Sequence, residues 1–202
     1  MTTHAIDALR LVGGHPALDF ANTLGQQLDG APNEHLVDYA ALLAWSRRVG
    51  LSTARETTRL GRAAVAQPAE ASRILTRARA LRSAIFALFA ARAGGRSAPH
   101  DALARLNREL ADALAHSALA PADGGFDWRW TGDPAALERV LWPLARAAAD
   151  LLAAPELAAV RECAGAECHW LFLDLSKNRR RRWCAMELCG NRAKIRRFRA
   201  GA

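Results

Sequence analysis

Four cysteines near the end of the chain form two pairs with the same spacing, C-x4-C. The first pair is Cys163 and Cys168 and the second is Cys184 and Cys189, all within the last forty of 202 residues. Structural zinc takes four tetrahedral ligands, with thiolate sulfur at about 2.3 Å, and two close pairs supply them with little strain in the intervening loop. In a reducing cytoplasm, clustered cysteines favour metal over disulfides. The spacing therefore predicts one Zn2+ ion held by these four residues.

Other interpretations of the same residues stay open at this point. His169 follows Cys168 and is an alternative ligand in its place, and clustered thiols also hold iron–sulfur clusters or form redox disulfides. A module of roughly forty residues buries too little apolar surface to fold alone, so metal binding is expected to supply much of its folding free energy. The predicted zinc is therefore structural and not catalytic.

The charge of the chain is concentrated in the same region. The formal net charge is +8, and residues 170–202 carry ten basic side chains against two acidic ones, whereas residues 1–169 carry eighteen of each. Two acidic groups cannot neutralise ten bases locally, which indicates an anionic partner. Arginine binds phosphates and reads guanine in the major groove, so the expected partner is DNA, with RNA as the alternative. The predicted contact residues are Lys177, Arg179, Arg180, Arg181, Arg182, Arg192, Lys194, Arg196, Arg197 and Arg199.

A basic helix is expected to begin at Asn191, whose side chain can cap it. Arginines recur at helical spacing over residues 192–199 and would form one face, while Ile195 and Phe198 fall on another side. These two apolar residues are expected to pack on the cysteine cluster. That packing would leave few apolar groups to insert into lipid, so no membrane partner is predicted. The loop 179–182 is expected to hold the nucleic-acid backbone.

Ordered motifs in this region resemble a known family. They are Phe172-Leu-Asp174, Ser176-Lys-Asn, Arg181-Arg-Trp-Cys184 and Cys189-Gly-Asn-Arg192, which with both cysteine pairs are similar to the CGNR zinc-finger family of predicted bacterial transcription regulators. The segment GGHPALDFANTL, Gly13–Leu24, resembles the opening of the ABATE domain that accompanies this finger. The resemblance implies a stress-linked transcription regulator with an N-terminal sensing or interaction domain, zinc on the four cysteines and DNA on the arginines. Within CGNR, Gly190 is expected to use its freedom in φ to turn the chain.

The rest of the chain is predicted to be mainly helical. Apolar residues recur at helical spacing in five stretches, residues 36–49, 52–66, 68–93, 99–119 and 134–153. Short strands are expected at 126–131, as half of a hairpin, and at 157–163 and 169–174, whereas 11–25 fits either a strand or a first helical turn. The expected fold is α+β, with a mainly helical domain over 1–155 carrying a few short strands, here called the body. A small treble-clef-like zinc finger with a basic helix follows over 156–202, here called the finger.

The body offers fewer functional clues. His15, Asp19 and Asn22 are candidates for a ligand pocket, although residues of these types more often hydrogen-bond local backbone near a turn. No P-loop, dinucleotide-binding glycine motif, HExxH or nucleophile elbow is present, so no catalytic residue is predicted and the protein is not expected to be an enzyme. An enzyme in the body tethered by the finger, and an RNA-binding or ribosome-associated protein, are the alternatives.

Two expectations concern the state of the protein in the cell. No signal peptide or transmembrane stretch is recognisable in the sequence, which predicts a cytoplasmic protein. The body is expected to sense a small-molecule ligand or to dimerise. A homodimer is a further hypothesis, because bacterial operators are often read by symmetric dimers.

Overall fold

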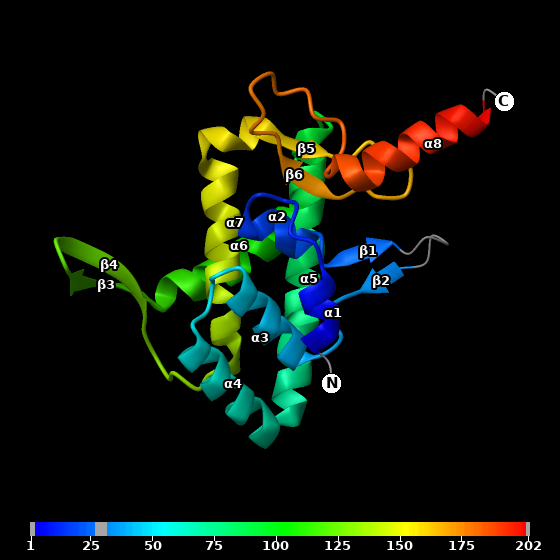
Figure 1. Cartoon of the computed structure of the whole chain (residues 1–202). Helices are drawn as coiled ribbons and strands as arrows, with labels where there is room; N and C mark the ends of the chain where they lie inside the picture. The colour runs from blue at the N-terminus through cyan, green and yellow to red at the C-terminus, as the bar shows by residue number, and fades with distance from the viewer. Residues whose placement is uncertain (1–2, 27–31, 201–202) are drawn as a thin grey trace.

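The computed structural model describes residues 3–26 and 32–200, in which helices pack around one long central helix (Figure 1). The helices are α1 (Thr3–Ala8), α2 (Pro16–Ala21), α3 (Tyr39–Arg48), α4 (Ala54–Ala66), α5 (Pro68–Ala93), α6 (His100–Ala115), α7 (Trp142–Ala153) and α8 (Asn191–Ala200). Shorter helical turns are η1 (Leu137–Val140), η2 (Pro155–Ala159) and the π-helical η3 (Met186–Gly190). Within these described residues, three antiparallel strand pairs complete the fold: β1 (Leu24–Gln26) with β2 (Pro32–Glu34), β3 (Ser117–Ala122) with β4 (Gly125–Trp130), and β5 (Val160–Glu162) with β6 (Leu171–Leu173). The predicted α+β class with a mainly helical body is confirmed.

Helix α5 is the axis of the body. Pro68 occupies its start, where a missing N–H costs nothing, and Gly94 follows its last residue. Its apolar residues Ile74, Leu81 and Ile85 are fully buried, because α2, α3, α4, α6 and α7 all pack against this helix. The predicted range 68–93 is confirmed.

Several other predicted elements are present with different ends. Helix α4 begins behind a capping box, in which Thr53 Oγ1 accepts from Glu56 N at 3.2 Å and Glu56 Oε2 accepts from Thr53 N at 2.7 Å. Helix α6 stops before the predicted residue 119, because the chain there enters β3, where Leu119 pairs with Trp128 of β4. The single helix predicted over 134–153 is wrong in its first part, since η1 precedes α7 and Pro143 favours a new helix start.

The segment 11–25, which fits a strand or a helical turn, contains a helix and then a strand. His15 caps α2, its Nδ1 accepting a hydrogen bond from Ala17 N at 3.2 Å, and Pro16 takes the first helical position. Helix α2 packs on α5 and α7. Its Phe20 is fully buried against Trp45, with the two ring centroids 5.0 Å apart.

Strands β5 and β6 join the finger to the body. Leu171 and Leu173 of β6 are buried in the same hydrophobic core as the helices. The buried Asn22 donates from Nδ2 to the Leu171 carbonyl and accepts from the Leu171 N–H at Oδ1, both at 2.9 Å. The Leu173 N–H donates to the Gly13 carbonyl at 2.8 Å. The core therefore continues past residue 155, and the division into two domains there stays a prediction.

An ion pair inside the body joins α5 to β2. The buried Arg82 donates from Nη1 and Nη2 to the two carboxylate oxygens of Glu34, both at 2.6 Å. Burial acts to raise the pKa of Glu34, but the hydrogen bonds and charge of Arg82 outweigh burial and hold that pKa below its usual range. The stabilisation from this ion pair is therefore complete above about pH 4.5, the pKa of Glu34 in the unfolded chain. It is lost as the pH falls through the lower pKa that Glu34 has in the folded protein.

Glu34→Gln is expected to lower the free energy of unfolding at neutral pH by about 2 kcal/mol, because it leaves a buried guanidinium without its counter-charge. Urea denaturation at neutral pH and at about pH 3 measures the effect. The difference in the free energy of unfolding between wild type and variant should shrink in acid, where Glu34 itself becomes protonated. A difference that does not change with pH would contradict the ion-pair explanation, and Glu156→Gln, at an exposed position, is the control.

Candidate metal centre

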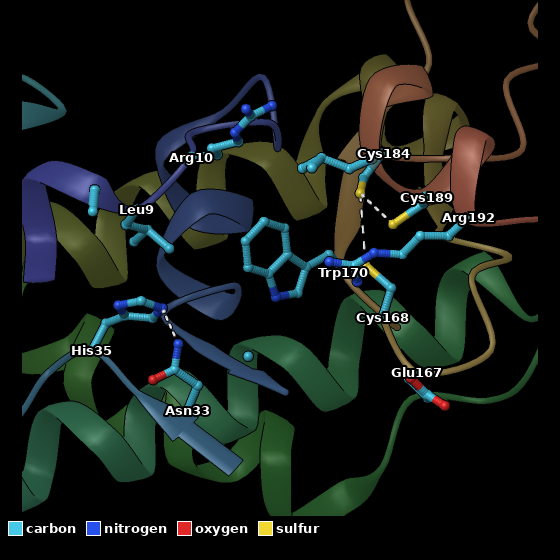
Figure 2. Close-up of a pocket in the computed structure, with 13 residues that line it drawn as sticks. Leu9, Arg10, Asn33, His35, Glu167, Cys168, Trp170, Cys184, Cys189 and Arg192 are labelled. Atoms are coloured by element: carbon cyan, nitrogen blue, oxygen red, sulfur yellow. Dashed lines mark hydrogen bonds between the residues drawn. The ribbon is translucent and has the colours of Figure 1, made fainter. Parts of the chain in front are cut away.

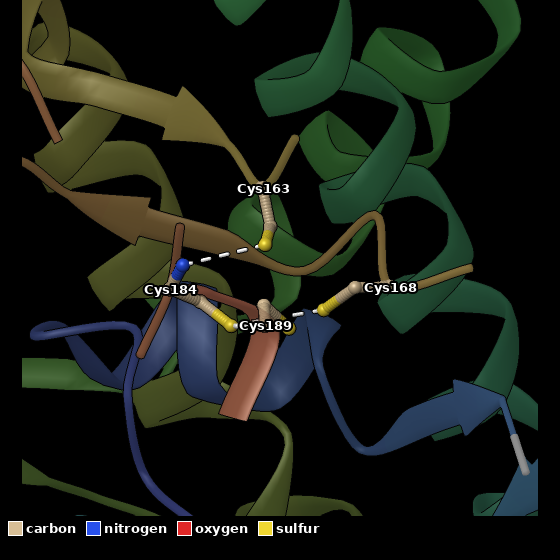
Figure 3. Close-up of side chains that lie close together, drawn as sticks. All are labelled: Cys163, Cys168, Cys184 and Cys189. Carbon is tan, nitrogen blue, oxygen red and sulfur yellow. Dashed lines mark hydrogen bonds between the residues drawn. The ribbon is translucent and has the colours of Figure 1, made fainter. Parts of the chain in front are cut away.

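The four cysteine side chains converge beside the β5–β6 pair (Figure 3). Cys163 directly follows β5, Cys168 lies in the turn before β6, and Cys189 lies in η3, which leads into α8. All four Sγ atoms lie within 4.8 Å of one another. Cys184 Sγ is 3.6 Å from Cys168 Sγ and 3.7 Å from Cys189 Sγ. The predicted cysteine cluster is therefore formed by the fold.

These separations fit a tetrahedral zinc ion. Four sulfurs at about 2.3 Å from a central ion lie about 3.8 Å apart, which is close to the separations of 3.6 and 3.7 Å. A disulfide needs sulfurs about 2.0 Å apart, and all four cysteines are free thiols. The cluster can therefore bind one zinc ion, as the sequence predicts.

The thiols cannot all ionise together without a cation. Hydrogen bonds with Cys168 and Cys184 lower the pKa of the Cys163 thiol, and the hydrogen bonds to Cys163 raise the pKa of both partners. Burial raises the pKa of Cys189. Negative charge thus gathers on one sulfur, whereas a divalent ion stabilises four thiolates at once. Zinc binding should accordingly release protons and weaken in acid.

Two glycines lie close to the cysteines in the chain, and one of them makes room for the cluster. A Cβ on Gly165 would lie 3.1 Å from Cys168 Cβ and 3.4 Å from Cys189 Sγ, so a larger residue would crowd both ligands. A Cβ on the buried Gly190 would overlap Met186 Sδ within η3. The φ angle of Gly190 lies outside the left-handed region, so the expectation that it turns the chain through free φ is wrong. The atoms nearest to that Cβ belong to the flexible side chain of Met186, which is 45% exposed and can move aside.

His169 lies apart from the sulfur cluster. Its Nδ1 is 2.8 Å from Glu162 Oε1, and its side chain is more than half exposed. Its φ of 54° is uncommon for a residue other than glycine, and it occurs in the turn that brings the chain from Cys168 into β6. The alternative ligand set, with His169 in place of Cys168, is therefore not the arrangement that this structure has.

Asp174 organises residues 175–183, here called the arginine loop. Its buried carboxylate accepts hydrogen bonds from Ser176 N at 3.1 Å, Ser176 Oγ at 2.5 Å and Arg181 N at 2.8 Å. Burial acts to raise the pKa of Asp174, but the hydrogen bonds from Ser176 and Arg181 hold that pKa below its usual range. The Arg181 guanidinium donates to the Cys184 carbonyl at 2.6 Å and lies 4.6 Å from the centroid of the Phe172 ring. These contacts hold the arginine loop against the metal centre.

The predicted nucleic-acid contacts fall in two places. Four are exposed in the arginine loop, Lys177, Arg179, Arg180 and Arg182, and five are exposed on α8, Arg192, Lys194, Arg196, Arg197 and Arg199. Arg181 differs from the others, because its guanidinium both donates a hydrogen bond to the Cys184 carbonyl and lies over the Phe172 ring. That engagement favours an architectural role for Arg181 over a contact with phosphate.

The expected packing of Ile195 and Phe198 on the cysteine cluster is wrong. Ile195 is 52% exposed and Phe198 is 79% exposed. The reason is that α8 packs mainly on η3 and then extends away from the rest of the molecule (Figure 1). Helix α8 therefore presents both its basic and its apolar side chains to solvent. The prediction of no membrane partner assumed that Ile195 and Phe198 are packed, and this support for it is lost.

His15, Asp19 and Asn22, the candidate ligand pocket, all take part in hydrogen bonds of the fold. His15 caps α2 and Asn22 holds Leu171, as described above. The buried Asp19 accepts a hydrogen bond from Gly13 N at 2.8 Å. Burial raises the pKa of Asp19 and lowers that of His15. A ligand pocket formed by these three residues stays a prediction.

A cavity of about 270 Å³ lies where the body meets the cysteines (Figure 2). Arg10 and Asn33 line it from the body, and Cys168, Trp170 and Arg192 line it from the finger. No sequence motif indicates this cavity, because its wall combines residues from the two ends of the chain. Only the fold brings them together.

Two family models match the chain in order. The model of the ABATE family, described as "Putative stress-induced transcription regulator", matches residues 14–155, and the model of the CGNR zinc finger matches residues 159–201. No curated protein matches the chain. Over residues 3–26 and 32–200, no helix combines the length and the apolar character needed to cross a membrane.

Proposed function

Because the chain belongs to the ABATE family and carries a CGNR zinc finger, we propose that it is a zinc-dependent transcription regulator whose finger binds DNA. The chain divides near residue 155 into a body that senses a ligand or dimerises and a finger that contacts DNA. The protein works in the cytoplasm and has no catalytic residue.

The exposure of α8 carries this proposal. The helix has ten residues, is therefore about 15 Å long, and carries five basic side chains, no acidic one and no buried one. The major groove of B-DNA is about 12 Å wide and admits a helix of this kind. Arg192, Arg196 and Arg199 share one face and would enter the groove. Asp174 holds the arginine loop in place, and the exposed side chains of this loop would contact the sugar-phosphate backbone of the DNA.

Binding to DNA is expected to weaken steeply with salt, because lysine and arginine displace condensed counterions from the phosphates. The triple variant Arg192→Ala, Arg196→Ala, Arg199→Ala should reduce the slope of log affinity against log salt by about 0.9 for each phosphate contact that it removes. Fluorescence anisotropy of a labelled duplex of random sequence, at several salt concentrations, measures that slope.

The matched control removes the same charge from exposed positions of the body, Arg55→Ala, Arg62→Ala and Arg92→Ala. It should keep the wild-type slope, and an equal loss in both variants would show that total charge and not α8 drives binding. Structured RNA of equal length should compete less well than the duplex, since preference for RNA would favour the RNA-binding alternative. Anionic vesicles test the alternative raised by the exposed Ile195 and Phe198. Binding to vesicles alone would overturn the proposal.

Dimerisation has its own support in the β3–β4 hairpin. Leu119 pairs with Trp128 and Pro121 with Phe126, so these side chains share one face, and its large apolar members are exposed. A symmetric dimer would match a palindromic operator with two copies of α8. Light scattering with and without DNA measures the mass, and a monomer under both conditions would remove dimerisation from the proposal.

A further inference from the structure

A second cavity, of about 200 Å³, shares Gly25, Cys168 and Trp170 with the cavity of Figure 2. It lies between α5, β1 and the turn that carries Cys168, and Arg82 and Phe86 line it from α5. Its wall is mostly apolar. We call it the knuckle cavity. An apolar pocket with a few polar groups is the usual form of a small-molecule site.

Two buried N–H groups of this lining lack a hydrogen-bond partner in the described part of the chain. They are Arg82 Nε and Trp170 Nε1. Arg82 is only 4% exposed, so water outside the protein does not solvate this group. Buried donors are nearly always satisfied in folded proteins, and these two orphan donors belong to residues that line a cavity, where an acceptor would supply the missing partner. The residues that line the knuckle cavity therefore include two with a donor that lacks a partner.

The charge of Arg82 is already balanced. Its Nη1 and Nη2 bind both oxygens of Glu34 at 2.6 Å, and Nη1 also lies 3.3 Å from Thr23 Oγ1. An occupant therefore has to offer an acceptor oxygen to the remaining donors but does not have to bring a negative charge. An engineered apolar cavity of about 150 Å³ binds benzene, so the knuckle cavity has room for a single ring with a small substituent.

We propose that the knuckle cavity binds a small neutral molecule, which presents a carbonyl-type oxygen to Trp170 Nε1 and Arg82 Nε and lays an apolar body against Phe86. The occupant would touch the finger at a zinc ligand, Cys168, and at Trp170, whose carbonyl accepts a hydrogen bond from Cys163 N at 2.8 Å. Binding there would stabilise the arrangement that holds the metal. The idea that such binding regulates the protein rests on the function proposed above. The binding itself does not depend on that function.

Acetophenone is the probe, because it joins one ring to one carbonyl, and ethylbenzene is the probe without oxygen. The readout is the indole N–H signals of the six tryptophans in the zinc-loaded full chain. Acetophenone should shift the Trp170 signal, which Trp170→Phe identifies, and should leave that of Trp45 unchanged, although Trp45 Nε1 is also buried without a partner. Affinity for acetophenone should exceed that for ethylbenzene about tenfold for each hydrogen bond that the carbonyl oxygen accepts. Trp170→Phe should reduce that advantage about tenfold while ethylbenzene still binds.

Gly25→Ala tests whether acetophenone binds in the knuckle cavity. The added methyl would lie 3.5 Å from Trp170 Cζ2 and 3.6 Å from Nε1, which is ordinary contact, so the variant should fold and hold zinc while it narrows the cavity and weakens acetophenone binding. Gly125→Ala, where a Cβ meets no atom within 4 Å, is the control and should bind acetophenone like the wild type.

Three outcomes would overturn the proposal. They are no shift of Trp170 with acetophenone, equal affinity for acetophenone and ethylbenzene, and tighter binding of benzoate, which would show that the site selects a charge. The DNA titrations described above are run on the same samples. Salt-sensitive DNA binding without a Trp170 shift would overturn the cavity proposal alone, and a Trp170 shift without DNA binding would support the cavity and overturn the proposed function.

Discussion

Cys184→Ser is expected to abolish zinc binding and to unfold the arginine loop and α8, while the helices of the body stay folded. Cys184 Sγ is the sulfur that lies 3.6 Å from Cys168 Sγ and 3.7 Å from Cys189 Sγ, so its loss opens the cluster. A serine hydroxyl does not ionise at neutral pH and cannot replace a thiolate. Structural zinc contributes on the order of 10 kcal/mol to the folding of small modules. Strand β6 should nevertheless stay in place, because Leu171 and Leu173 belong to the core of the body.

Three measurements separate these effects. Bound zinc should fall from about one ion per chain to background. Amide hydrogen exchange should become fast in α8 and the arginine loop, while the near-ultraviolet circular dichroism of the buried Trp45 and Trp142 persists. Glu167→Gln, beside Cys168, is the control and should keep its zinc. Zinc retained by Cys184→Ser would show that the ligand set is wrong, and a lost dichroism signal would show that the body needs the metal.

Asn22→Ala is expected to lower the free energy of unfolding by about 4 kcal/mol, because it leaves two buried backbone groups of Leu171 without partners and a cavity beside them. Asn22 is the side chain through which α2 holds β6, with both hydrogen bonds at 2.9 Å. The same residue is a candidate for a ligand pocket. A large loss of stability without any added ligand would support the structural role.

Urea denaturation followed by circular dichroism measures this loss. Asn107→Ala, at an exposed position of α6, removes the same side chain where it has no buried partner, and it should change the free energy of unfolding by less than about 0.5 kcal/mol. The zinc ion should stay bound to Asn22→Ala under native conditions, because none of the four cysteines is altered. Equal stabilities of the two variants would contradict the structural role of Asn22.

Features that depend on neighbours along the chain are predictable from the sequence. Pro68 and Gly94 bracket α5, and Thr53 with Glu56 forms the capping box before α4, as local patterns indicate. The four-cysteine cluster is of the same kind, because its spacing alone carries the chemistry. The exposure of Phe198 is different in kind. Its helical spacing suggests a packed face, and only the path of α8 away from the body leaves it in solvent.

Features that depend on residues far apart along the chain could not be predicted. Asn22 and Leu171 are separated by 149 residues, and Arg82 and Glu34 by 48. No periodicity or motif links the members of such pairs. The knuckle cavity is a further case, because Trp170 Nε1 and Arg82 Nε are orphan donors only in the folded chain. A single sequence shows the residue types but not which of them face each other.

The pairing of Asn22 with Leu171 also sets an order of events during folding. A growing polypeptide leaves the ribosome from its N-terminus, so α2 is synthesised long before β6. Contacts between residues so distant in sequence form late, because closing the long loop costs entropy before the contact repays it. Until β6 arrives, the amide of Asn22 has only water as a partner and one side of the core is uncovered. A chain whose β6 has not yet docked is therefore an easier substrate for cellular proteases, and protease resistance of the body reports that Leu171 and Leu173 have reached the core.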